Sequence, residues 1–88
     1  ATRARVYYNL GLLLQSLNRH SEAERALLEA VKIDPHNPDF LYGASFFYFK
    51  TGKFLQSKRL AQKLVDQHPA NAAGRRILTL VDKKLRKP

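Results

Sequence analysis

Hydrophobic and polar positions recur along this chain with a helical period. Between residues 4 and 17, apolar or small side chains stand at i, i+3, i+4 and i+7, namely at Val6, Tyr7, Leu10, Gly11, Leu14 and Leu17. This spacing predicts a first helix over residues 4–17, and the polar sequence NRH that follows is expected to end it.

A second helix is predicted to start at the sequence SEAE. Ser21 can cap the free backbone amides, and Glu24, three residues later, can return a hydrogen bond to the cap, which makes a capping box. The apolar positions of this helix are Ala23, Ala26, Leu27, Ala30 and Val31. Asp34 and Pro35 are expected to stop it.

Turn residues predict three further helices. Asn37 as N-cap, with Pro38 at the first helical position, opens a third helix, which Gly52 closes as a left-handed C-cap. A fourth helix is expected over residues 55–67, ahead of Pro69, and Asn71 is expected to cap a fifth over residues 72–86. The chain is therefore predicted to be all-α with five helices.

The two halves of the chain are related by a fixed period. Pro35 and Pro69 lie 34 residues apart, and each follows an amphipathic run and precedes an asparagine. The shift keeps residue character at most positions: it places Leu14 over Tyr48, Asn18 over Gly52, Leu27 over Ala61 and Ala30 over Leu64. Such a period indicates an internal helical repeat.

The first unit resembles a tetratricopeptide repeat. The family pattern W-x2-L-G-x2-Y, then A-x3-F, then P is matched by Tyr7, Leu10, Gly11, Leu14, Ala23, Leu27 and Pro35. The second unit is matched more loosely, by Leu41, Ala44, Ser45, Tyr48, Ser57, Ala61 and Pro69. The resemblance implies one domain over residues 1–88, in which antiparallel helix hairpins stack as a short right-handed α-solenoid. Its units would be residues 4–37 and 38–71, with a capping helix at 72–86.

Seven of the nine aromatic residues lie between residues 40 and 54, more than one buried helix face can hold. In a stacked array, Leu41, Ala44, Ser45 and Tyr48 would face the partner helix, and Phe40 and Phe47 would face a neighbouring unit. Tyr42, Phe46 and Phe49 remain, at i, i+4 and i+7. One interpretation is that the last helix covers them as core, and the other is that they bind a partner.

The resemblance implies that this stripe lies on the concave inner surface of the array. Its counterparts there come from the first and last helices. The candidate partner-binding residues are Arg5, Tyr8, Leu12, Tyr42, Phe46, Phe49, Lys50, Arg76 and Lys83. Monomers seldom leave large apolar patches exposed without a use, so the stripe is a candidate for binding a protein or for self-association.

Charge narrows the kind of partner. Residues 1–37 carry five basic and four acidic side chains (+1), residues 38–71 five and two (+3), and residues 72–88 six and one (+5). Basic side chains beside an apolar groove suit an acidic amphipathic peptide, although cations at a helix C-terminus also simply offset its dipole. Single-stranded nucleic acid is the alternative partner, but the low charge of the first unit interrupts a basic track.

One known use of the family is excluded by the residues. Gripping the C-terminal carboxylate of chaperone peptides requires Lys, Asn and Arg side chains on the inner helices. At the matching positions this chain has Tyr8, Leu12, Gly43, Ala73 and Ile77. We expect no such clamp.

Signals for catalysis are weak. With no cysteine there is no thiolate nucleophile, disulfide or Cys-based zinc site, and the compartment is left open, with the cytoplasm slightly favoured. His20, His36 and His68 fall in different predicted turns without metal-binding or acid–base spacing. We expect no enzyme activity, no metal and no cofactor.

Two further features of the sequence concern membranes and the length of the protein. Apolar runs are short and interrupted by charge, so we expect no membrane partner. The chain begins at Ala1 without a methionine, which is compatible with a piece of a longer protein. An accessory domain fused to an enzyme is therefore a third interpretation, beside protein binding and nucleic-acid binding.

Overall fold

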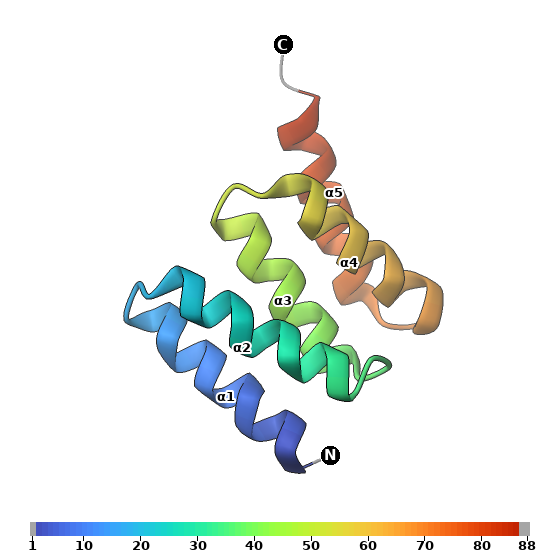
Figure 1. Ribbon diagram of the computed structural model, residues 1–88. Helices are drawn as coiled ribbons and strands as arrows, with labels where there is room; N and C mark the ends of the chain where they lie inside the picture. The colour runs from blue at the N-terminus through green and yellow to red at the C-terminus, as the bar shows by residue number, and fades with distance from the viewer. Residues whose placement is uncertain (1, 87–88) are drawn as a thin grey trace.

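The computed structural model describes residues 2–86, which form five α-helices joined by short turns (Figure 1). They are α1 (Thr2–Ser16), α2 (His20–Ile33), α3 (Pro38–Lys50), α4 (Phe54–Gln67) and α5 (Ala72–Leu85). No strand occurs in this part of the chain. The predicted all-α class and the five helices are confirmed, and the helix ends lie within two residues of their predicted positions.

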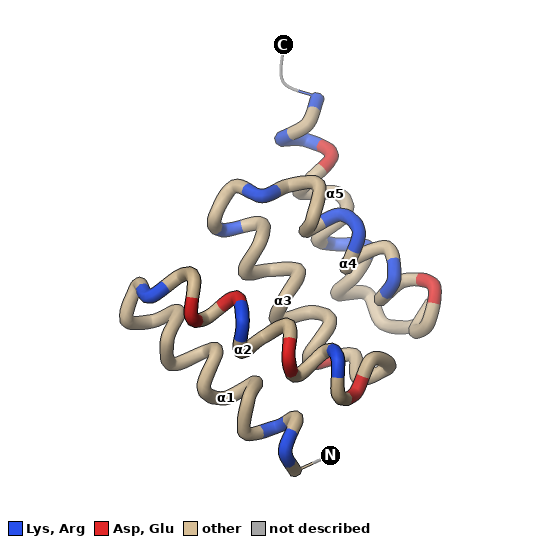
Figure 2. The backbone as a smooth tube through the Cα atoms, viewed as in Figure 1, with Lys and Arg blue, Asp and Glu red and all other residues tan. Residues whose placement is uncertain are grey.

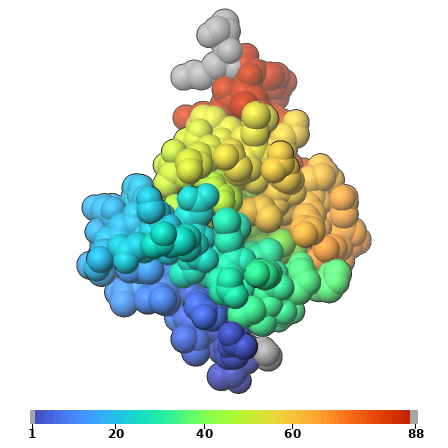
Figure 3. Space-filling view, in the orientation of Figure 1, coloured from blue at the N-terminus to red at the C-terminus, as the bar shows by residue number. Residues whose placement is uncertain are grey.

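The helices pack as antiparallel hairpins. α1 pairs with α2 and α3 with α4, while α2 lies against α3, and α5 packs on both α4 and α3. The Cα positions extend 39 × 29 × 15 Å, and the short dimension fits two layers of helices. In Figures 1 and 3 the first hairpin (blue and cyan) lies directly against the second. The arrangement is an all-α helical-repeat stack.

The turns follow the predicted chemistry. The Asn37 side chain accepts hydrogen bonds from the backbone amides of Asp39 (2.9 Å) and Phe40 (3.4 Å), and Asn71 accepts one from Ala73 (2.9 Å). Gly52 has φ +82°, in the left-handed region that glycine favours. Asn18, which the 34-residue shift places over Gly52, has φ +62°.

The predicted capping box is wrong. α2 begins at His20, and its N-cap residue, Arg19, makes no side-chain capping hydrogen bond, so Ser21 lies inside the helix. Glu24 instead accepts a hydrogen bond from the Tyr48 hydroxyl (2.7 Å), and its other oxygen lies 3.7 Å from Lys53 Nζ. The carboxylate thus joins the two hairpins, a long-range role that the local pattern could not reveal.

Small residues allow the helices of each hairpin to approach closely, as predicted. A Cβ at Gly11 would lie 2.7 Å from the Leu27 side chain. In the second hairpin, the buried hydroxyls of Ser45 and Ser57 each donate to the other residue's carbonyl, at 3.1 and 2.8 Å. These contacts leave no room for larger side chains at the hairpin interfaces.

The apolar pattern of α1 is only partly core. Tyr7 and Leu14 are half-buried, but Val6, Leu10 and Leu17 are exposed. The helical spacing of these positions therefore does not make them all core, because within residues 2–86 only the inner side of α1 is packed against other helices.

Candidate functional site

The predicted partner-binding residues lie on three helices that neighbour one another. α1 touches α3 through the Tyr8 and Phe40 rings, whose centroids are 5.0 Å apart, and α3 packs against α5. We call the predicted set the candidate surface. It consists of Arg5, Tyr8 and Leu12 on α1, of Tyr42, Phe46, Phe49 and Lys50 on α3, and of Arg76 and Lys83 on α5.

Four aromatic rings form a continuous row across this surface. Tyr42 and Phe46 stack with centroids 5.8 Å apart, and Phe46 and Phe49 stack at 6.5 Å. The row continues at 5.8 Å into Phe54, the first residue of α4. We call these four residues the aromatic row. Sequence reasoning missed Phe54 because it follows the Gly52 turn and so lies outside the helical stripe, although it belongs to the same aromatic cluster in the chain.

The rings of the aromatic row are neither fully buried nor fully exposed. All four are half-buried, and on one side they pack against Ala61 of α4 and Ile77 and Val81 of α5. The last helix therefore covers part of the stripe, as the structural interpretation supposed, but leaves part of each ring accessible.

Tyr48 lies on a different face of α3, as predicted. Its side chain is only 4% exposed, and it belongs to the main core. Burial raises the pKa of the Tyr48 phenol well above its ordinary value, and the hydrogen bond that Tyr48 donates to Glu24 adds to this effect. α3 thus separates a core face from the candidate surface.

The α1 end of the candidate surface is held by close packing. A Cβ at position 43 would overlap the Tyr8 ring, so Gly43 is needed for Tyr8 to lie against α3. The Arg5 guanidinium lies 4.9 Å from the centre of the Phe40 ring and 3.8 Å from the Asp39 carboxylate. Burial and the nearby Asp39 charge raise the pKa of Tyr8. Arg5 therefore already contacts an aromatic ring and an acid.

Residues 4–37 match the family model of the tetratricopeptide repeat. The chain carries a tetratricopeptide repeat. The matched segment contains most of α1, all of α2 and the turn to α3. This match confirms the resemblance found in the sequence, and the five helices are consistent with two repeats and a capping helix. Tetratricopeptide repeats generally mediate protein–protein interaction and scaffolding, and they are interaction modules rather than catalysts.

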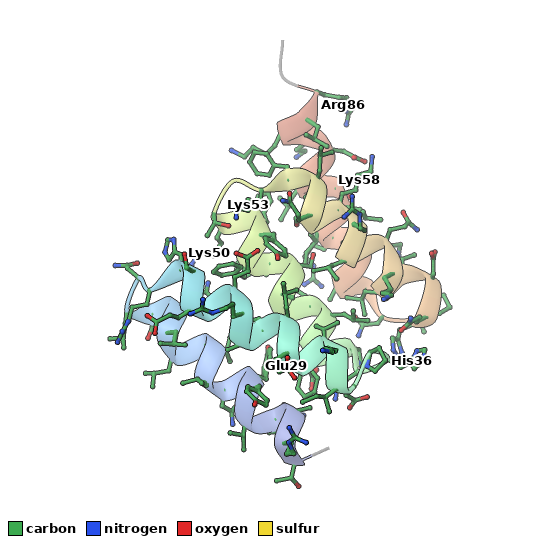
Figure 4. The ribbon with its side chains drawn as sticks, in the orientation of Figure 1. Glu29, His36, Lys50, Lys53, Lys58 and Arg86 are labelled. Atoms are coloured by element: carbon green, nitrogen blue, oxygen red, sulfur yellow. The ribbon has the colours of Figure 1, made fainter. Side chains whose placement is uncertain are left out.

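A lysine lies against the aromatic row of this repeat protein. Lys50 Nζ lies 5.7 Å from the centre of the Phe46 ring, within cation–π range. Arg76 and Lys83 on α5 are exposed. Figure 2 shows further basic residues along α4 and α5, and Figure 4 shows Lys50 and Lys53 on either side of the α3–α4 turn. Lys87 and Pro88 of the basic tail lie outside the described residues.

The histidines of the repeat protein do not form a metal site. His20 is the first residue of α2, with its ring edge-on to Phe47 at 6.1 Å. His36 and His68 lie in adjacent turns, since His68 Nε2 is 2.6 Å from the His36 carbonyl oxygen. Among residues 2–86, no three His, Cys, Asp or Glu side chains are grouped so that they could hold a metal ion.

None of the helices within residues 2–86 is both long and apolar enough to cross a membrane.

Proposed function

We propose that the candidate surface binds an acidic amphipathic segment of another protein. The observation that carries this proposal is the aromatic row, four adjoining half-buried rings with the Lys50 ammonium 5.7 Å from the centre of the Phe46 ring. The row would be the apolar floor of the binding site, and Arg5, Lys50, Arg76 and Lys83 would be its basic rim. Aromatic anchors of this kind often carry most of the binding energy in a protein interface.

Exposed leucines on α1 and α5 support a longer contact. Leu12 of α1 and Leu80 of α5 are 41% and 38% exposed. Both of these helices contact α3, which carries three of the four rings. A partner segment that crossed all three helices would therefore bury leucine as well as aromatic surface. Full burial of one such side chain is favourable by about 1.5 to 3 kcal/mol.

The charges favour an acidic partner. The candidate surface carries four basic residues. One of them, Arg5, has an acidic neighbour in Asp39, whose carboxylate lies 3.8 Å from its guanidinium. Glutamate or aspartate side chains flanking the apolar positions of a partner could contact Lys50, Arg76 and Lys83.

The proposal includes the division of the chain into units. We propose that residues 38–71 form a second repeat and that residues 72–86 act as a capping helix. In support, Ser45 and Ser57, which are hydrogen-bonded across the second hairpin, are shifted by 34 residues from Gly11 and Ala23 of the first. The side chains of Arg75, Thr79 and Asp82 follow one side of α5. A polar outer face of this kind is what a terminal repeat requires.

Two peptides test the proposal. One is a helix-forming peptide with Leu and Phe at i and i+4 flanked by Glu, and the other keeps the apolar residues but replaces each Glu by Lys. The labelled acidic peptide is titrated with the parent chain and with its variants. The double substitution Phe46→Ala and Phe49→Ala should raise the Kd of the acidic peptide about tenfold or more. Leu55→Ala is the matched control, because Leu55 is 66% exposed and belongs neither to the candidate surface nor to the aromatic row, and it should leave the Kd unchanged.

Nucleic acid gives a different result in the same titrations. A single-stranded oligonucleotide held by the basic residues would lose affinity with salt, by about 0.7 in log K per log salt for each neutralised phosphate. Submicromolar binding that follows this slope and survives the double aromatic substitution would replace our proposal. Equal affinity for the Glu and Lys peptides would refute the preference for an acidic partner but not the binding of an apolar peptide.

A further inference from the structure

A second apolar surface lies on the outer side of α1, away from the candidate surface. Val6, Leu10, Leu13 and Leu17, which we call the α1 outer stripe, are 60%, 43%, 57% and 57% exposed. Their spacing of four, three and four residues keeps them on one side of the helix. They make up four of the nine large hydrophobic residues that are exposed in the described part of the chain.

The equivalent face of the second hairpin is covered by another hairpin. Shifting by 34 residues places Phe40, Ala44 and Phe47 over Val6, Leu10 and Leu13. The three α3 residues are at most 3% exposed, because the first hairpin covers them. The α1 outer stripe is therefore an equivalent helix face that no other hairpin within residues 2–86 covers.

A hollow with a partly apolar and partly charged lining lies beside the stripe. It has a volume of about 450 Å³ and lies between α1 and α2, where Tyr7, Leu10 and Leu14 meet Ala26 and a rim formed by Glu22, Arg25 and Glu29. Glu29 lies on α2 in Figure 4. A helix laid along the α1 outer stripe could place side chains of its own in this hollow.

We propose that the α1 outer stripe is covered by the same stripe of a second copy of this chain, running antiparallel. The spacing of four, three and four reads the same in both directions. An antiparallel copy therefore places Val6 opposite Leu17 and Leu10 opposite Leu13, and the two-fold symmetry repeats each of these pairs once. This is the self-complementarity that a two-fold interface requires.

Charge favours a copy in this orientation. Residues 6–18 contain no charged side chain, and in Figure 2 α1 is tan from its basic N-terminal turn to its end. The chain as a whole carries a net charge of +9, so copies repel one another over most other approaches. In the antiparallel pair, Arg3 of each copy would lie near the start of α2 in the other copy, where Arg19 and Glu22 form an ion pair. A parallel pair would instead bring the two Arg3 and the two Arg5 side chains together.

The oligomeric state of the 88-residue chain tests the proposal. Sedimentation over a concentration series should show a monomer–dimer equilibrium. Leu13→Glu should weaken the dimer about tenfold or more, because it buries a carboxylate at the centre of both halves of the interface. Leu13 is exposed in the monomer, so the variant should keep the helical circular dichroism spectrum of the parent.

Two controls separate this interface from the other surfaces. Leu55→Glu places the same charge on a leucine of α4 that is 66% exposed, against 57% for Leu13, and should leave the dimer intact. Phe46→Ala with Phe49→Ala should also leave it intact, so failure of the candidate surface and failure of this proposal can be told apart. A chain that stays monomeric up to about 0.1 mM would refute the proposal. So would a dimer that Leu13→Glu does not weaken, or one that the aromatic variant abolishes.

Single cysteines test the orientation, since the natural chain has none. At a rise of about 1.5 Å per residue, the two Leu13 positions of an antiparallel pair lie about 4.5 Å apart along the helices, and the two Leu17 positions about 16 Å. A short thiol cross-linker should therefore join Leu13→Cys chains efficiently and Leu17→Cys chains poorly. Equal cross-linking at both positions would indicate a parallel pair and overturn the antiparallel arrangement.

Discussion

Replacing Tyr48 separates two contributions of one side chain to the free energy of unfolding. The ring is buried among residues of both hairpins, and its hydroxyl donates a 2.7 Å hydrogen bond to Glu24 of α2. Tyr48→Phe removes the hydrogen bond and keeps the ring, whereas Tyr48→Ala removes both. The two variants therefore measure the polar link between the hairpins and the packing beneath it.

The expected magnitudes follow from burial. A hydrogen bond to a charged group contributes about 1.5 to 3 kcal/mol, and water can partly replace it here because the Glu24 side chain is 30% exposed. We expect Tyr48→Phe to cost about 1 to 2 kcal/mol. Tyr48→Ala leaves a cavity in the core and should cost about 3 to 5 kcal/mol. Phe49→Ala is the matched control on the same helix, and its half-buried ring should cost about 1 to 2 kcal/mol.

Urea unfolding followed by circular dichroism measures these differences, provided that the slope with urea concentration is the same for all variants. For a chain of this size, each kcal/mol also lowers Tm by about 4 to 8 °C. A double-mutant cycle with Glu24→Gln isolates the Tyr48–Glu24 coupling. The reasoning fails if Tyr48→Phe is as stable as the parent, or if Phe49→Ala costs as much as Tyr48→Ala.

Two further outcomes are expected from the core. Ala23 is completely buried in the first hairpin, so Ala23→Leu should destabilise the chain by about 1 to 3 kcal/mol through overpacking, and an unchanged urea midpoint would show that α1 and α2 do not pack this closely. The raised pKa values of Tyr48 and Tyr8 predict that stability holds up to about pH 10, where unfolded tyrosine ionises, and falls as pH rises further, because only the unfolded chain then releases these protons. Tyr48→Phe should flatten that fall in unfolding experiments between pH 9 and about 11.5, and an unaltered slope would contradict the assignment.

The sequence alone determined where α3 and α5 begin and where α3 ends. Asn37 and Asn71 cap α3 and α5 as predicted, and Gly52 ends α3 with a positive φ. These features depend on groups a few residues apart, so the local pattern contains all the information they need. The 34-residue period and the small residue at Gly11 extended this local knowledge to the stacking of hairpins.

Only the tertiary structure decided which faces are covered. Glu24 has the spacing of a helix cap, but its hydrogen-bond partner is Tyr48, 24 residues away. Val6 and Phe40 occupy equivalent positions in the repeat, yet one is 60% exposed and the other 1%. The physical reason is the same in both cases: hydrophobic periodicity gives each helix an apolar face, whereas the burial of that face and the partners of its polar groups depend on helices that are distant in the sequence.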